Sequence, residues 1–127
     1  MHLALIFALL AAAAPAAALP LCGAGPRENC VVDGDTIWLA GEKIRLLGID
    51  APELTGAKCA AESALARQAA ERLAALTQGR IVVAREGTDR YGRTLARLSV
   101  ATGDLGGILI AEGLARPWTG RRESWCR

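Results

Sequence analysis

Residues 33–53 constrain the fold of this chain more than any other stretch. Two short β-rich runs, residues 36–39 and 43–49, are separated by an Ala-Gly-Glu sequence that is typical of a hairpin turn. Pro52 follows the second run closely, and because its ring nitrogen cannot donate a hydrogen bond, the chain must leave the sheet there. The stretch therefore predicts an antiparallel hairpin, with acidic residues at both of its ends.

The segments around this hairpin predict a small barrel. Residues 30–32 read as a strand, residues 60–78 as a helix, residues 80–85 and 93–100 as two further strands, and residues 104–112 as a short helix. Five short strands with glycine-rich corners and a helix after the third are typical of the OB-fold. We therefore expect a mainly β fold with helices (α+β): a five-stranded OB-fold barrel with two helices.

Local signals predict how these elements begin and end. Gly34, between two aspartates, predicts a turn or bulge in which glycine supplies an unusual backbone conformation. Gly79 should end the long helix, and Asp104 should cap the short one. The inward-facing residues of the long helix fall at helical spacing: Leu65, Ala69, Leu73 and Leu76.

The first 18 residues resemble a secretory signal peptide. Residues 3–14 form an unbroken apolar run, too short for a membrane-spanning helix, and small residues follow Pro15. Cleavage after Ala18 would leave residues 19–29 as a lead-in and residues 30–127 as one domain. We therefore expect an exported protein, periplasmic or secreted. The alternative is a lipid anchor at Cys22, because the Leu-Pro-Leu-Cys sequence vaguely resembles a lipobox.

All four cysteines follow the expected signal peptide, and an even number in a small exported chain predicts two disulfides. Three pairings are possible, and we expect one bridge to staple the lead-in. A zinc site is disfavoured because the chain has no C-x-x-C sequence and its single histidine is His2. The cysteines are Cys22, Cys30, Cys59 and Cys126.

The charge distribution excludes a globally basic, passive nucleic-acid binder, since the formal net charge is +2. Positive charge is local instead and concentrates in the last dozen residues, as a solvated tail or as part of a binding surface. Its members are Arg116, Arg121, Arg122 and Arg127, against one Glu123.

The acidic residues flanking the hairpin are candidate ligands for a hard cation. Asp35, Asp50 and the backbone carbonyl of Ala51 would supply oxygen atoms of the kind that Ca²⁺ prefers. Carboxylates that face one another would repel unless a cation lay between them. The competing interpretation is that each aspartate simply forms a turn.

Two arginines and a glutamate complete the candidate site. Arg45 interrupts an apolar run, and Arg93 is the first residue of an expected strand, so both guanidinium groups could bind a phosphate at the barrel mouth. Glu53 follows Pro52 and could accept a proton from a water molecule that attacks phosphorus. Ordinary surface roles are the alternative for all three. Without a histidine after the signal peptide, the remaining route combines a metal, arginines and a carboxylate.

Three motifs together resemble the staphylococcal (micrococcal) nuclease, or thermonuclease-like, family. They are Val-Asp-Gly-Asp-Thr at 32–36, Arg-Leu-Leu-Gly-Ile-Asp-Ala-Pro-Glu at 45–53 and Asp-Arg-Tyr-Gly-Arg at 89–93. Each motif alone is weak, but the ordered set is specific, and the similarity runs from about residue 30 to residue 118.

This resemblance implies an OB-fold barrel of the staphylococcal nuclease type and calcium-dependent hydrolysis of DNA or RNA. It implies calcium ligation by Asp35, Asp50 and the Ala51 carbonyl, with Asp33 in support. The implied catalytic residues are Arg45, Glu53 and Arg93. The implied substrate-binding residue is Tyr91, to which we add Arg90 and, for base stacking, Trp118. Trp118 and Trp125 could equally be core residues.

Two functions from different classes therefore compete. The first is an exported calcium-dependent nuclease that acts on DNA or RNA as a monomer, with no protein partner implied. The second is a catalytically inactive OB-fold module that binds nucleic acid or protein at the cell surface. The joint presence of the acidic and basic motif residues favours the nuclease, since a silent module has no need of the whole set.

Overall fold

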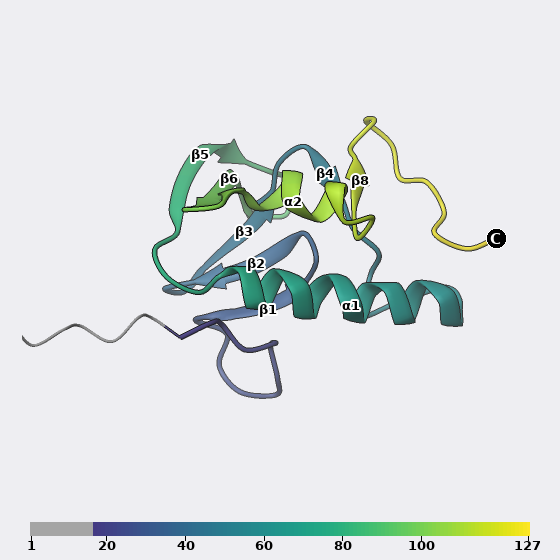
Figure 1. Cartoon of the computed structure of the whole chain (residues 1–127), viewed down its shortest axis with the longest axis horizontal. Helices are drawn as coiled ribbons and strands as arrows, with labels where there is room; N and C mark the ends of the chain where they lie inside the picture. Colours follow the sequence, from purple (N-terminus) through teal and green to yellow (C-terminus); the bar gives the residue numbers. More distant parts are fainter. Residues whose placement is uncertain (1–16) are drawn as a thin grey trace, which may run out of the picture.

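The computed structural model describes residues 17–127 (Figure 1). The expected signal peptide, residues 1–18, lies outside the described residues apart from its last two positions. Within the described part of the chain, neither helix is long and apolar enough to cross a membrane.

One mixed sheet forms the centre of the fold, and its five longer strands follow the spatial order β1-β2-β3-β6-β5. Neighbouring strands run antiparallel except β3 and β6, which are parallel. The strands are β1 (Cys30–Asp33), β2 (Thr36–Leu39), β3 (Glu42–Leu46), β5 (Val82–Thr88) and β6 (Thr94–Val100).

Three two-residue strands were not expected from the sequence. The first, β7 (Gly103–Asp104), pairs with β6, while β4 (Ile49–Asp50) and β8 (Arg116–Pro117) form a separate antiparallel ladder. The expected 43–49 strand is broken after Leu46, because Gly48 adopts a φ of 79° and turns the chain. Asp50 thereby lies opposite Arg116, which is 66 residues away in the sequence.

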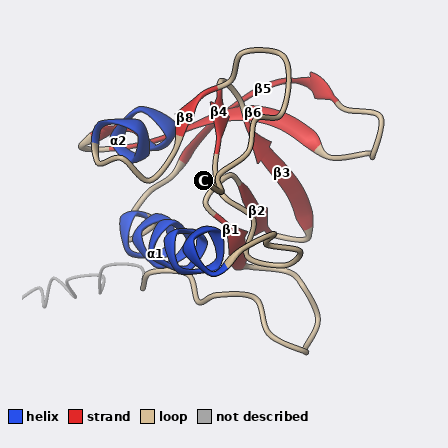
Figure 2. Ribbon diagram, turned by 90° about the vertical axis from the view of Figure 1, so that its right-hand side faces the viewer, coloured by secondary structure: helices blue, strands red, loops and turns tan. Residues whose placement is uncertain are grey.

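Two helices complete the α+β arrangement that the sequence predicts, α1 (Ala60–Leu76) and α2 (Leu105–Ala111). In Figure 2, α1 lies beside β1, while α2 lies near β8. Asp104 caps α2 as predicted, by accepting a hydrogen bond from the Gly107 amide at 2.8 Å. Helix α1 ends at Leu76, and its C-terminal cap is Thr77 rather than Gly79: the Thr77 amide donates to the Ala74 carbonyl.

Small side chains allow α1 to pack tightly. Of its four predicted core residues, Ala69 and Leu73 are fully buried, whereas Leu65 and Leu76 are only half-buried. Ala66, Ala70 and Ala74 bury the rest of that face against the sheet. The largest fully buried apolar side chains of the core come from both layers: Val31, Ile37, Ile44, Leu73, Leu98, Leu105 and Leu109.

The two disulfides join Cys22 to Cys30 and Cys59 to Cys126. The first staples the lead-in to β1, where the Cys22 amide also bonds to the Val31 carbonyl at 2.8 Å. The second ties the C-terminal segment to the residue that caps α1. Two disulfides were predicted, but their pairing was open among three possibilities.

The turn between β1 and β2 differs from expectation in its cause. Gly34 does not adopt a positive φ. A Cβ atom at this position would instead lie 2.8 Å from the Cβ atoms of both Ala51 and Ala69. Glycine is therefore required by close approach: the turn, α1 and the exit from β4 meet at one point.

We predict that Gly34→Ala lowers the free energy of unfolding by about 1–3 kcal/mol, since an extra methyl group must displace two packed elements. Denaturant unfolding of purified protein measures the change. Gly25→Ala is the matched control, because no atom lies within 4 Å of the added Cβ. Equal stability of the two variants would contradict the packing argument.

Candidate functional site

One cavity of about 800 Å³ collects most of the residues that the sequence singles out. It opens beside β3, the β1–β2 turn and the turn before β6. Asp50 and Ala51 do not line it, and both are buried. The predicted residues that do line the cavity are Asp33, Asp35, Arg45, Glu53, Arg90, Tyr91, Arg93 and Trp118.

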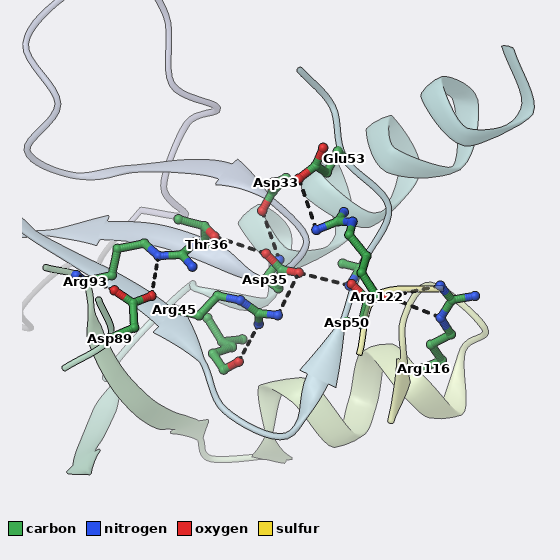
Figure 3. A network of polar contacts seen from close by, with 12 residues as sticks. Asp33, Asp35, Thr36, Arg45, Asp50, Glu53, Asp89, Arg93, Arg116 and Arg122 are labelled. Carbon is green, nitrogen blue, oxygen red and sulfur yellow. Dashed lines mark hydrogen bonds and ion pairs between the residues drawn. The ribbon is translucent and has the colours of Figure 1, made fainter. Parts of the chain in front are cut away.

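Asp35 is the centre of the polar network at the base of this cavity (Figure 3). Its Oδ2 atom accepts the Ala51 amide at 3.0 Å and lies 3.5 Å from Nη2 of Arg45. Its Oδ1 atom accepts the Thr36 hydroxyl at 3.0 Å. The Asp35 side chain therefore joins the β1–β2 turn to β3 and to the residues that follow β4. Asp35 is only 6% exposed, so these contacts lie in the interior of the protein.

Asp33 and Asp35 lie close together in the β1–β2 turn. The Asp33 carboxylate accepts the Asp35 amide at 3.2 Å. Burial raises the pKa of the Asp33 carboxyl, and repulsion by Asp35 raises it further, to about 8, while the Arg45 charge partly opposes the rise. Two carboxylates in this position therefore favour a bound proton or a bound cation.

Asp50 forms an ion pair that the sequence analysis did not anticipate. Arg116 approaches its Oδ2 atom with Nη2 at 3.1 Å and Nε at 3.2 Å (Figure 3). The same guanidinium donates to the backbone carbonyls of Glu123 and Ser124. The interpretation of the C-terminal arginines as a solvated tail is therefore wrong for Arg116, because the β4–β8 ladder carries it to Asp50.

The other oxygen of Asp50, Oδ1, is buried and accepts no hydrogen bond from the described residues. Within residues 17–127, no three acidic, histidine or cysteine side chains gather closely enough to hold a metal ion by themselves. The candidate ligands would thus need water or a substrate oxygen to complete a shell, as Ca²⁺ sites accept. A free carboxylate oxygen and a charge-strained Asp33 beside Asp35 fit a hard cation.

The two predicted arginines are held in different ways. Nη1 of Arg45 donates to the Leu46 carbonyl at 2.7 Å, which directs the rest of the guanidinium toward Asp35. Nε of Arg93 donates to Asp89 at 2.7 Å, and the other Asp89 oxygen accepts the Tyr91 and Arg93 amides. Burial of Asp89 raises its pKa, but the hydrogen bonds from Arg93 and Tyr91 outweigh this and lower the pKa below its ordinary value.

Glu53 lies at the rim and points toward the C-terminal segment. Its Oε1 atom is 3.1 Å from Nη1 of Arg122, and both side chains are roughly half exposed (Figure 3). Buried Glu62 of α1 supports the loop, because its carboxylate accepts the Lys58 amide at 2.8 Å and approaches the Glu53 amide at 3.5 Å. Glu53 is therefore placed by a fixed backbone but remains accessible.

The aromatic residues divide into two groups. Tyr91 is 67% exposed and Trp118 45% exposed, so neither is a core residue. Arg90 and Arg93 both lie over the Tyr91 ring, at 4.8 and 5.5 Å from its centroid. Trp125 is half-buried instead, with the Arg116 guanidinium 3.9 Å from its ring centroid.

Sequence reasoning gave no individual role to three residues that the structure brings to the site: Asp89, Arg116 and Arg122. Asp89 had a usable signal, since an aspartate four residues before Arg93 in a glycine-containing turn is typical of a side chain that bonds its own turn. The sequence placed the two arginines in a basic cluster, but no local signal could have identified their partners, because each is paired with an acidic residue more than 60 positions away.

We predict that Arg116→Met lowers the free energy of unfolding by about 1–3 kcal/mol, because it leaves the buried Asp50 carboxylate without its hydrogen-bond donor. Adding Asp50→Asn should restore part of the loss, since the uncompensated charge is then gone. Chemical denaturation of the variants measures both effects. Arg67→Met is the control, because the Arg67–Glu71 pair is exposed. No recovery in the double variant would contradict the pairing argument.

Comparison with known proteins supports the assignment of this fold. The family described as "Staphylococcal nuclease homologue" matches residues 43–124, a range that contains Arg45, Asp50, Glu53 and Arg93 but begins after Asp35. The chain is also similar to "Succinoglycan biosynthesis protein ExoI" of Rhizobium meliloti (strain 1021), with 38% identity over 122 residues. That alignment covers 88% of this chain and 60% of the relative's length. The chain therefore belongs to the staphylococcal nuclease homologue family.

Proposed function

We propose that this protein is an exported, calcium-dependent nuclease that hydrolyses phosphodiester bonds of DNA or RNA. The observation that carries the proposal is the convergence of Arg45, Glu53 and Arg93 on one cavity whose base is the Asp33–Asp35 pair. These residues come from β3, the loop after β4 and the turn before β6. Membership of the staphylococcal nuclease homologue family supports the same chemistry.

The calcium ligands in this proposal are Asp35, Asp50 and the backbone carbonyl of Ala51, with Asp33 in support. The Oδ1 atom of Asp50, which accepts no hydrogen bond from residues 17–127, and the repulsion between Asp33 and Asp35 support this choice. Bound there, the ion would supply positive charge to a phosphate oxygen. Asp35 already accepts the Ala51 amide, so the chain itself holds two of these residues together.

Arg45 and Arg93 would bind the phosphate and stabilise the negative charge that develops on its oxygens. Hydrogen bonds that already hold each guanidinium support this role, since an oriented donor needs little reorganisation during the reaction. Glu53 would accept the proton of the attacking water, and its exposed carboxylate at the cavity rim is accessible to one.

Tyr91, Arg90 and Trp118 would bind the nucleotides on either side. Exposed aromatic rings offer stacking surfaces for bases of any sequence, and Arg90 adds positive charge beside the Tyr91 ring. Such contacts are compatible with both DNA and RNA.

Export to the periplasm or the medium is the proposed location, with the protein acting as a monomer. The two disulfides support export, since disulfides persist in oxidising compartments.

We predict that purified protein degrades DNA or RNA with Ca²⁺ and not with a chelator. Glu53→Gln and Arg93→Ala should each reduce turnover at least ~10²-fold, as expected when one transition-state contact is lost. Arg67→Ala and Glu71→Gln, on the exposed face of α1, are matched controls and should retain full activity. Wild-type rates for either site variant would refute the assigned role.

A second prediction separates catalysis from binding. Ca²⁺ together with a nucleoside monophosphate should raise the melting temperature, because ligands of the native state stabilise it by about 2.7 kcal/mol at a hundredfold excess over Kd. Asp35→Asn should abolish the calcium-dependent part of the shift in a thermal denaturation assay. A shift without any hydrolysis of DNA or RNA would instead support the inactive binding module.

A further inference from the structure

We infer that Arg122, together with Lys58, forms a second phosphate-binding subsite, which takes the phosphate next to the one that is cleaved. The inference rests on the proposed function and adds to it a minimum length of substrate. It assigns a binding role to the C-terminal segment, residues 118–127, which follows β8.

The first observation is the position of Arg122 between two cavities. Arg122 and Glu53 both line the main cavity of about 800 Å³, and both also line a second cavity of about 270 Å³. Lys58 lines the second cavity and is exposed. Two further glutamates line it and already have partners: buried Glu62 accepts the Lys58 amide, and Glu123 lies 3.8 Å from Arg121. A polynucleotide whose reacting phosphate lies beside Arg45 and Arg93 can therefore continue past Arg122 toward Lys58.

The second observation is how firmly the C-terminal segment is held. The Cys59–Cys126 disulfide ties its end to the start of α1. On its inner side, Arg116 donates to the carbonyls of Glu123 and Ser124 and stacks on Trp125. These anchors position the backbone next to Arg122, so that binding an anion there costs little chain entropy.

The third observation is that the Arg122 guanidinium remains available to a ligand. It forms no hydrogen bond with residues 17–127, and its contact with Glu53 is an ion pair between side chains that are 46% and 40% exposed. Pairs this exposed contribute only about 0–1 kcal/mol. A phosphate can therefore replace Glu53 as the partner of Arg122 at a small cost in free energy. The Glu53 carboxylate is then no longer paired.

The proposal is tested by comparing ligands that differ in their number of phosphates. Binding of a dinucleoside monophosphate and of a single-stranded hexanucleotide is measured by calorimetry with Ca²⁺, using phosphorothioate linkages to slow cleavage. Arg122→Ala should weaken the hexanucleotide about tenfold, the loss expected for a charge-assisted hydrogen bond, and leave the shorter ligand unchanged. The slope of log K against log salt for the hexanucleotide should fall by about 0.7.

Arg121→Ala is the matched control, since Arg121 is the adjacent residue, has an 82% exposed side chain and lines neither cavity. Arg122→Lys should recover part of the lost affinity. Cys59→Ser with Cys126→Ser should weaken the hexanucleotide as Arg122→Ala does, and circular dichroism checks that each variant is folded.

Three results would overturn the inference. One is an Arg122→Ala variant with unchanged hexanucleotide affinity, and another is equal losses for both ligands. The third is faster cleavage by Arg122→Ala, which would make Arg122 an inhibitor of Glu53. If the wild-type protein binds neither ligand, the proposed function is refuted as well. If it binds both but Arg122→Ala has no selective effect, only the second subsite is refuted.

Discussion

The carboxylate of Asp35 is the interaction on which the rest of the site depends. It is buried, it accepts hydrogen bonds from the Ala51 amide and the Thr36 hydroxyl, and it forms an ion pair with Arg45. Through these contacts it joins the turn after β1 to the exit from β4, two places where the chain would otherwise be free to diverge. Gly34 makes the same junction possible sterically, because any side chain there would collide with both neighbours.

The carboxylates of Asp35, Asp50 and Glu53 lie near one another, and arginines from two parts of the chain form ion pairs with them. Arg45 comes from within the sheet, whereas Arg116 and Arg122 come from the C-terminal end of the chain. The Cys59–Cys126 disulfide holds the C-terminal arginines near the site, because it joins the end of their segment to the start of α1. A segment that composition alone describes as a basic tail therefore contacts the candidate site through two ion pairs.

Much of the fold could be predicted because its signals are local. Residue periodicity predicted the five longer strands and both helices, and Asp104 was correctly predicted as the N-terminal cap of α2. The interruption between β3 and β4 was harder to predict. The turn at Gly48 lies between β3, which pairs with β6, and β4, which pairs with β8. The two-residue strands carry too few side chains to produce a pattern at all.

The sequence by itself determined which chemical groups are present: the acidic turn at Asp33 and Asp35, the arginines at 45 and 93, and Glu53. Each lies in a motif whose members are neighbours along the chain, so the ordered motifs could be recognised by their resemblance to a known family. Only the tertiary structure decided what those groups face. The partners of Asp50 and Glu53 are more than 60 residues distant, and an ion pair of that span arises from strand pairing and a disulfide, not from any local pattern.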